Sequence, residues 1–157
     1  NDSTWLNRAK VAADINETWY YLWNIPSRID GDPAELSVKP GVSTIGMNLC
    51  TTTNSGTDTY SSRDVVSYAR LYKWTNDSHY LEIARMLMHS TKNMMALPGR
   101  TYDLCKPGMQ QEFWFLAPAR GYCWIREYTP WVSANQLHGI FQTEAFDTNV
   151  YNSIVNY

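Results

Sequence analysis

Hydrophobic positions in the middle of the chain recur at helical spacing on both sides of a short polar turn, residues 75–78. Before the turn, Val65, Ala69 and Tyr72 recur at intervals of four and three residues, as on one face of an α-helix. After the turn, apolar residues lie on two sides of a second helix: Leu81, Ala84, Met88 and Met95 on one, and Ile83, Leu87 and Met94 on the other. A connection this short makes the helices antiparallel. The pattern predicts a helical hairpin over residues 61–97, with its second helix buried between neighbours.

Further helices are predicted near both ends of the chain. Over residues 3–23, one helical face carries Trp5, Ala9, Ala12, Asn16, Trp19 and Trp23. Pro26 ends this helix, because proline has no N–H to donate. Thr129 and Pro130 suit the cap and first position of another helix, which reaches Asp147. A short helix is expected in the tail that follows.

The segments between these helices are rich in turn-forming residues and are predicted to be long irregular loops. They span residues 26–59 and 98–128, with a short helix expected at residues 111–116. Short extended pieces are an alternative around Leu36, Val38, Val42 and Ile45, and a short strand is an alternative to an ordered loop at residues 121–129. A loop this long inside a compact domain is usually functional. The sequence therefore predicts an all-α fold of antiparallel helical hairpins with long irregular loops, as a single helical domain over residues 1–157.

Composition and charge narrow the possible partners. The chain has 157 residues, 44% of them hydrophobic, which is enough for one domain with a core. The net charge is −2 and there is no basic run, so nucleic acid is not an expected partner. No apolar run is long enough to span a membrane. The chain begins at Asn1 without an initiator Met and enters a helix at once, which we interpret as a processed product or a piece of a longer protein.

The aromatic content is high, at 14% with 7 Trp and 11 Tyr. These rings pack a core, or they line a cleft in which sugars stack through their C–H groups. The three cysteines, Cys50, Cys105 and Cys123, match no zinc or redox spacing, and the histidines are scattered. No metal and no cofactor are therefore expected.

Residues 65–90, VVSYARLYKWTNDSHYLEIARMLMHS, resemble the helix pairs of six-hairpin (α/α)6-toroid glycosidases and related bacterial polysaccharide-degrading proteins. The family's ARLY, TGD and YL..A pattern stands here as Ala69-Arg70-Leu71-Tyr72, Thr75-Asn76-Asp77, and Tyr80-Leu81 with Ala84. TPWVSANQLHGIFQTEAFD, residues 129–147, looks like a closing helix of such proteins.

The resemblance implies a partial α/α toroid, because a complete six-hairpin ring needs twelve helices and this chain has room for about half. The chain is then a C-terminal or other part of a larger toroid, whose remainder is one expected partner. A carbohydrate substrate is the other. The activity implied is glycosidic bond cleavage in a poly- or oligosaccharide by an exported bacterial protein, secreted or periplasmic.

Two carboxyl residues are the candidates for this chemistry, since glycoside hydrolysis uses an acid and a nucleophile or base. Asp58 lies in a polar loop just before a helix start, and Glu112 lies beside Trp114. A carboxyl group against a Trp ring in a dry cleft has a raised pKa, which suits a general acid. The structural alternatives are a cap or loop-ordering role for Asp58 and a favourable helix-dipole interaction for Glu112.

Other residues are candidates for substrate binding. Tyr60, Trp114 and Trp124 are the predicted stacking rings, and Glu127 lies in an aromatic loop where pairing with Arg126 is its alternative role. Glu144 and Asp147 are weaker candidates for the acid or base than Asp58 and Glu112. His138 on the last helix is interpreted as a packing histidine and not as a base.

Three functions therefore remain open. The first is a glycoside hydrolase, or a polysaccharide lyase with a base and a uronate-neutralising group. The second is a non-catalytic helical domain that binds a sugar or a protein. The third is a toroid enzyme acting on prenyl groups, against which the sequence shows no Asp-rich metal motif.

Overall fold

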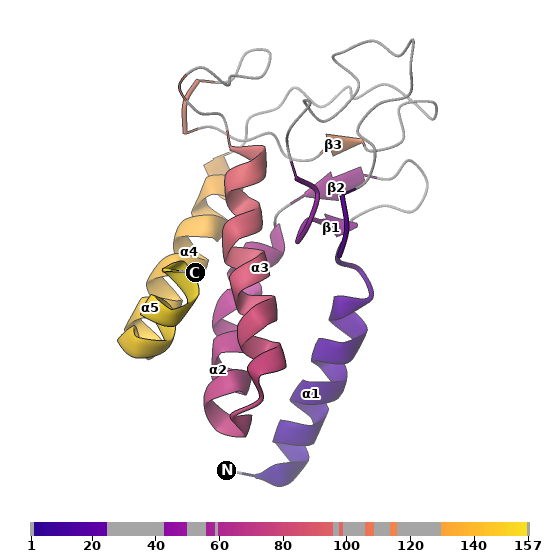
Figure 1. The fold of residues 1–157 in the computed structure, drawn as a ribbon, viewed down its shortest axis with the longest axis vertical. Coiled ribbons are helices and arrows are strands. Elements are labelled where there is room, and N and C mark those ends of the chain that lie inside the picture. Colours follow the sequence, from indigo (N-terminus) through magenta and orange to yellow (C-terminus); the bar gives the residue numbers. More distant parts are fainter. Residues whose placement is uncertain are drawn as a thin grey trace.

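A computed structural model describes residues 2–24, 43–49, 56–58, 60–95, 98, 106–108, 114–115 and 130–156 (Figure 1). Along these residues the elements are α1 (Ser3–Glu17), β1 (Asn48–Leu49), β2 (Gly56–Asp58), the 3₁₀ helix η2 (Tyr60–Asp64), α2 (Val65–Thr75), α3 (Ser78–Met94), β3 (Trp114–Phe115), α4 (Pro130–Phe146) and α5 (Thr148–Val155). The predicted helical class is confirmed, with a small sheet added. The toroid remains a prediction.

The predicted hairpin is confirmed as the antiparallel pair α2–α3 at the centre of the molecule (Figure 1). Asn76 turns the chain in the left-handed conformation, at φ 57°, and its N–H closes α2 on the Tyr72 carbonyl at 2.8 Å. Asp77 then caps α3, because its carboxylate accepts the N–H of His79 at 3.0 Å. The first predicted helix begins with a turn of 3₁₀ helix, η2, before α2.

The core lies between α2, α3 and α5, with one contribution from α1. Val65 and Ala69 of the predicted stripe are fully buried, while Tyr72 is half-buried. In α3 both predicted apolar sides are buried: Leu81, Ile83, Ala84, Leu87 and Met88. The second helix of the hairpin is therefore enclosed by its neighbours, as its pattern predicted.

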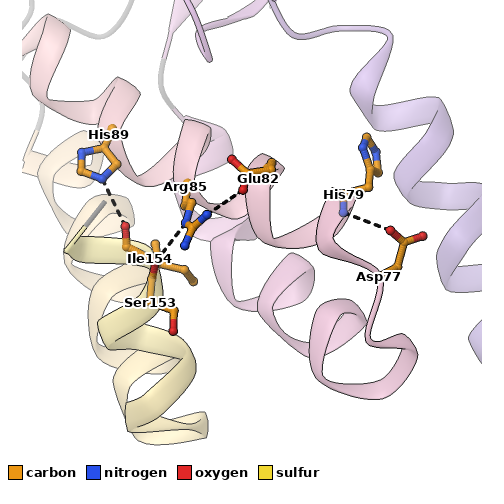
Figure 2. A network of polar contacts seen from close by, with 7 residues as sticks. All are labelled: Asp77, His79, Glu82, Arg85, His89, Ser153 and Ile154. Carbon is orange, nitrogen blue, oxygen red and sulfur yellow. Dashed lines mark hydrogen bonds and ion pairs between the residues drawn. The ribbon is translucent and has the colours of Figure 1, made fainter.

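The short helix α5 confirms the helix expected in the tail, and it docks on α3 through backbone carbonyls (Figure 2). Arg85 donates to the Ser153 carbonyl at 2.9 Å and also pairs with Glu82 at 2.6 Å. His89 Nε2 lies 3.2 Å from the Ile154 carbonyl. A carbonyl only accepts, so Nε2 donates here, and Nδ1 is left to accept from Lys92 at 3.0 Å. Side chains of α3 thus satisfy carbonyls that the end of a helix leaves unpaired.

Three short antiparallel strands form a sheet beyond the C-terminal end of α1 (Figure 1). In β1 and β2, Asn48 pairs with Asp58 and Leu49 with Thr57. In β2 and β3, Thr57 pairs with Trp114 and Gly56 with Phe115. The expected short helix at residues 111–116 is therefore wrong, because Trp114–Phe115 is a strand. Two adjacent aromatic residues favour an extended backbone with a partner strand.

The helix α1 is shorter than predicted because the residues after it pair with β1. The last turn tightens, with the Thr18, Trp19 and Tyr20 N–H groups each bonding three residues back. Tyr20 then bridges Asn48, and the Leu49 N–H donates to the Trp19 carbonyl at 2.8 Å. The helix consequently ends at Glu17, and the segment that was expected to continue it joins the sheet.

The tryptophans predicted on one face of the first helix are largely exposed. Trp5, Trp19 and Trp23 on that face are 65%, 44% and 64% exposed, and α1 buries Ala13 instead. In Figure 1, α1 stands on one side of the hairpin, with α4 and α5 on the other. The physical reason is that α1 packs on the core through Ala13, with Leu6 and Ala9 partly buried beside it, so the large rings stay at the surface.

The helix α4 crosses η2 at Gly139, and only a glycine fits there. A Cβ built on Gly139 would lie 2.2 Å from the Ser62 carbonyl oxygen. That oxygen belongs to backbone, which cannot move aside as a flexible side chain does. The approach fixes α4 against the start of the central hairpin.

We expect Gly139→Ala to destabilise the fold by about 1–3 kcal/mol, the range typical of overpacking. Replacing glycine by alanine inside a helix normally increases the free energy of unfolding by roughly 0.5–1 kcal/mol. A decrease in Gly139→Ala would therefore be specific evidence for the close contact. Chemical denaturation of the variant and of Gln142→Ala, on the exposed face of α4, makes the comparison. Equal or greater stability in Gly139→Ala would contradict the close approach.

Candidate functional site

Three of the six predicted site residues lie in the sheet or directly after one of its strands. Asp58 ends β2, Tyr60 begins η2 two residues later, and Trp114 begins β3. Pairing of Thr57 with Trp114 places β2 beside β3. The segments around Thr57 and Trp114 are 57 residues apart in sequence, yet they are neighbours in the sheet. Each was selected from the sequence independently of the other.

The remaining predicted site residues, Glu112, Trp124 and Glu127, lie outside the described residues. Glu112 precedes Trp114 of β3 by two positions in sequence. The predicted roles of all six residues stay predictions.

The strand carrying Asp58 is tied by backbone to the end of α1. Tyr20 bridges Asn48, and Asn48 pairs with Asp58, so the three backbones follow one another across a ladder. Neighbouring strands lie about 4.8 Å apart, which puts the Asp58 backbone roughly 10 Å from that of Tyr20. Asp58 therefore belongs to the same region as the C-terminal end of α1.

A polar cluster occupies that region, formed by Asn16, Tyr20, Asp64 and Tyr68. The Asn16 amide donates to the Tyr20 hydroxyl, and the Tyr68 hydroxyl donates to the Ala13 carbonyl at 3.4 Å. The rings of Tyr20 and Tyr68 lie 6.5 Å apart, centroid to centroid. These contacts join α1 to α2 through hydroxyl and amide groups as well as through Ala13.

Burial shifts the protonation of this cluster toward neutral forms. It raises the pKa of Asp64, against the opposing effects of Arg63 at 3.8 Å and of a hydrogen bond with Asn16. Burial also raises the pKa of Tyr68 to about 12 and that of Tyr20 still further. Asp64 is consequently a carboxyl group in the kind of environment that suits proton transfer.

A hydrogen bond between His79 and Glu17 lies next to this cluster, at the junction of α1 and α3. His79 Nε2 lies 2.7 Å from Glu17 Oε2, and the His79 ring packs edge-on against Tyr80. The second carboxylate oxygen, Glu17 Oε1, is buried and has no hydrogen-bond partner among the described residues. The region therefore holds two carboxyl groups, Asp64 and Glu17, close to the same tyrosines.

A groove of about 640 Å³ runs between α1 and α2, and Asp64 lies in its wall. Its lining combines small, aromatic and polar residues: Ala9, Ala12, Ala13, Ile15, Asn16, Trp19, Asp64, Ser67, Tyr68, Arg70, Leu71 and Trp74. A second hollow of about 460 Å³ shares Ala9 and Trp74 and adds Trp5. The first volume lies within the usual range for small-molecule sites, about 300–1,000 Å³.

The groove and Asp64 were not predicted from the sequence. Asp64 is not one of the apolar positions of the hydrophobic pattern, and it lies at the start of a helix, where acidic residues are common. The alanines at 9, 12 and 13 and Ser67 were a usable signal, since small residues on facing helices leave space between them.

The weaker candidates have structural or exposed positions. Asp147 caps α5, accepting the N–H groups of Asn149 and Val150 at 2.9 and 3.1 Å. It also pairs with Lys73 at 2.8 Å, which lowers the pKa of Asp147. Glu144 is exposed on α4, and so is His138, whose interpretation as a packing residue is wrong.

Among the residues that the structure describes, no group of three or more His, Cys, Asp or Glu side chains is placed to hold a metal ion. Of the helices described, none is long and apolar enough to cross a bilayer. Comparison of the chain with protein-family models, with curated proteins and with solved structures yields no match.

We expect the stability gained by Asp64→Asn to depend on pH. Because the pKa of Asp64 is raised by folding, ionising it costs stability above that pKa, and the cost vanishes below the unfolded value. The thermal midpoint of Asp64→Asn relative to the natural chain should therefore be most favourable at pH 7 and should decline toward pH 3.

Thermal unfolding of both proteins at pH 3, 5 and 7 measures this difference, with Glu144→Gln as an exposed control. A difference that is constant with pH, or that grows as pH falls, would show that Asp64 is not buried in this way.

Proposed function

We propose that this chain is a carbohydrate-active, glycoside hydrolase-like protein that cleaves glycosidic bonds of a poly- or oligosaccharide. In this proposal it is part of a larger α/α toroid, exported by a bacterium to the periplasm or the medium. The observation that supports the proposal is the pairing of Thr57 with Trp114. It brings together the two segments of the sequence that contain the proposed acid and base, Asp58 and Glu112.

The reaction needs one carboxylic acid to protonate the leaving oxygen and one carboxylate to act as nucleophile or base. Asp58 and Glu112 are the proposed pair. A separation of about 5–5.5 Å between their carboxyl groups corresponds to retention of configuration, and roughly 6.5–9.5 Å to inversion with a water between them. Tyr60, Trp114 and Trp124 supply ring faces for the sugar, and Glu127 supplies hydrogen bonds.

The second candidate function is a non-catalytic domain that binds a sugar or a protein partner. The groove between α1 and α2 favours it, because exposed Trp19 and Trp74 give the groove ring surfaces that a sugar can contact without any bond being cleaved. The two functions differ in one respect that can be measured, namely turnover.

We expect Asp58→Asn and Glu112→Gln each to reduce turnover by about 10²–10⁴-fold, the usual contribution of a general acid or base. The measurement is release of aryl group or reducing sugar from a panel of aryl glycosides and polysaccharides. Asp14→Asn, at an exposed position on α1, is the matched control and should retain activity.

Unchanged turnover in both variants would overturn the assignment of the two carboxyl groups. Binding of a polysaccharide without any turnover by the natural chain would instead support the non-catalytic function.

A further inference from the structure

The walls of the groove between α1 and α2 carry residues at the same helical spacing. Along α1 and the turn that follows it, the lining includes Ala9, Ala12, Asn16 and Trp19; facing them are Asp64 at the end of η2 and Ser67, Leu71 and Trp74 of α2. Within the helices these positions are three or four residues apart, so they lie on one side of each helix. At 1.5 Å per residue, the helical part of each wall extends about 10 Å.

The two ends of the groove carry tryptophan rings, and small residues form its middle. Because α1 and α2 run in opposite directions (Figure 1), Trp19 and Asp64 lie at one end, while Trp74 and Ala9 lie at the other. Trp19 and Trp74 are 44% and 52% exposed, so each has ring surface available to a ligand. The shape suits an extended ligand that contacts a ring at each end.

Polar groups in the groove argue against an apolar occupant. Asn16, Asp64, Ser67 and Arg70 all contribute to the lining. An apolar protein helix laid over them would remove Asp64 from water, at a cost of several kcal/mol for an ion or a shift to its neutral form. A ligand with many hydroxyl groups donates to the carboxyl group and to the amide oxygen, and accepts from the guanidinium.

We propose that this groove binds a linear oligosaccharide, which stacks on Trp19 and Trp74 and makes hydrogen bonds to Asn16 and Asp64. The inference rests on the carbohydrate activity proposed above and assigns that activity a surface that holds the glycan chain. The Trp19 end adjoins the sheet, because the Trp19 carbonyl accepts the N–H of Leu49 in β1, which pairs with β2. A glycan in the groove is therefore directed toward the strand that carries Asp58.

The test compares four variants with the natural chain. Trp19→Ala and Trp74→Ala remove a ring, Ala12→Trp fills the groove at an exposed position, and Trp74→Phe restores a ring. Trp23→Ala is the matched control, since Trp23 is 64% exposed and does not line the groove. Circular dichroism verifies that every variant folds.

Affinity is measured by electrophoresis through gels containing a β-1,4-glucan, a β-1,4-xylan, an α-1,4-glucan or polygalacturonate. We expect retardation by at least one polysaccharide, weakened roughly tenfold or more in both alanine variants and in Ala12→Trp. Trp74→Phe should recover most of the affinity, and Trp23→Ala should keep all of it.

Three outcomes would overturn the inference: retardation by none of the four polysaccharides, equal retardation of all variants, or self-association of the natural chain that Ala12→Trp abolishes. Hydrolysis of a small aryl glycoside, too short to span the groove, is measured in parallel. If the aryl glycoside is still hydrolysed while the groove variants leave retardation unchanged, the groove is not the glycan-binding surface, but the proposed activity is still supported. If retardation depends on the groove but nothing is hydrolysed, the glycan site stands without cleavage.

Discussion

The apolar surfaces of α2 and α3 bury each other so fully that Val65, Ala84 and Leu87 have no exposed area, and the other helices attach around that pair. Each attachment is different in kind. On one side α4 approaches backbone to backbone at Gly139, and α5 is held through its terminal carbonyls by Arg85 and His89. On the other side α1 contributes Ala13 and a set of tyrosine hydroxyl contacts. The groove lies at the attachment of α1, where small residues and hydroxyl contacts join it to α2.

Local periodicity explains which parts of the fold were predictable. The hairpin, the helix after Pro130 and the tail helix each carry their own signals in consecutive residues: apolar spacing, a turn at Asn76 and Asp77, or a cap. The strands carry no such signal, because a pair such as Thr57 and Trp114 is defined only when distant segments meet. The end of α1 was misjudged for the same reason, since Tyr20 leaves the helix to pair with Asn48.

The same distinction between local and long-range information separates the candidate site residues that were predicted from those that were not. Asp58 was identified because its polar segment and the helix after it are adjacent in sequence, whereas the structure places it at the end of β2 and not in a loop. Asp64 was passed over because its sequence context is that of an ordinary helix start, whereas its character comes from burial beside Asn16 on another helix. Residue chemistry can be read from a sequence, but the space around a residue depends on how far apart two helices stand.

The ladder that runs from Tyr20 through Asn48 to Asp58 has a mechanical consequence. It fastens the C-terminal end of α1 to the strands, while the opposite end of the helix has no equivalent tether among the described residues. The Trp19 end of the groove is therefore held by backbone pairing, whereas toward the Trp74 end α1 meets the core through side chains, Leu6 and Ala9. The two ends of the same groove thus differ in the kind of contact that fixes their width.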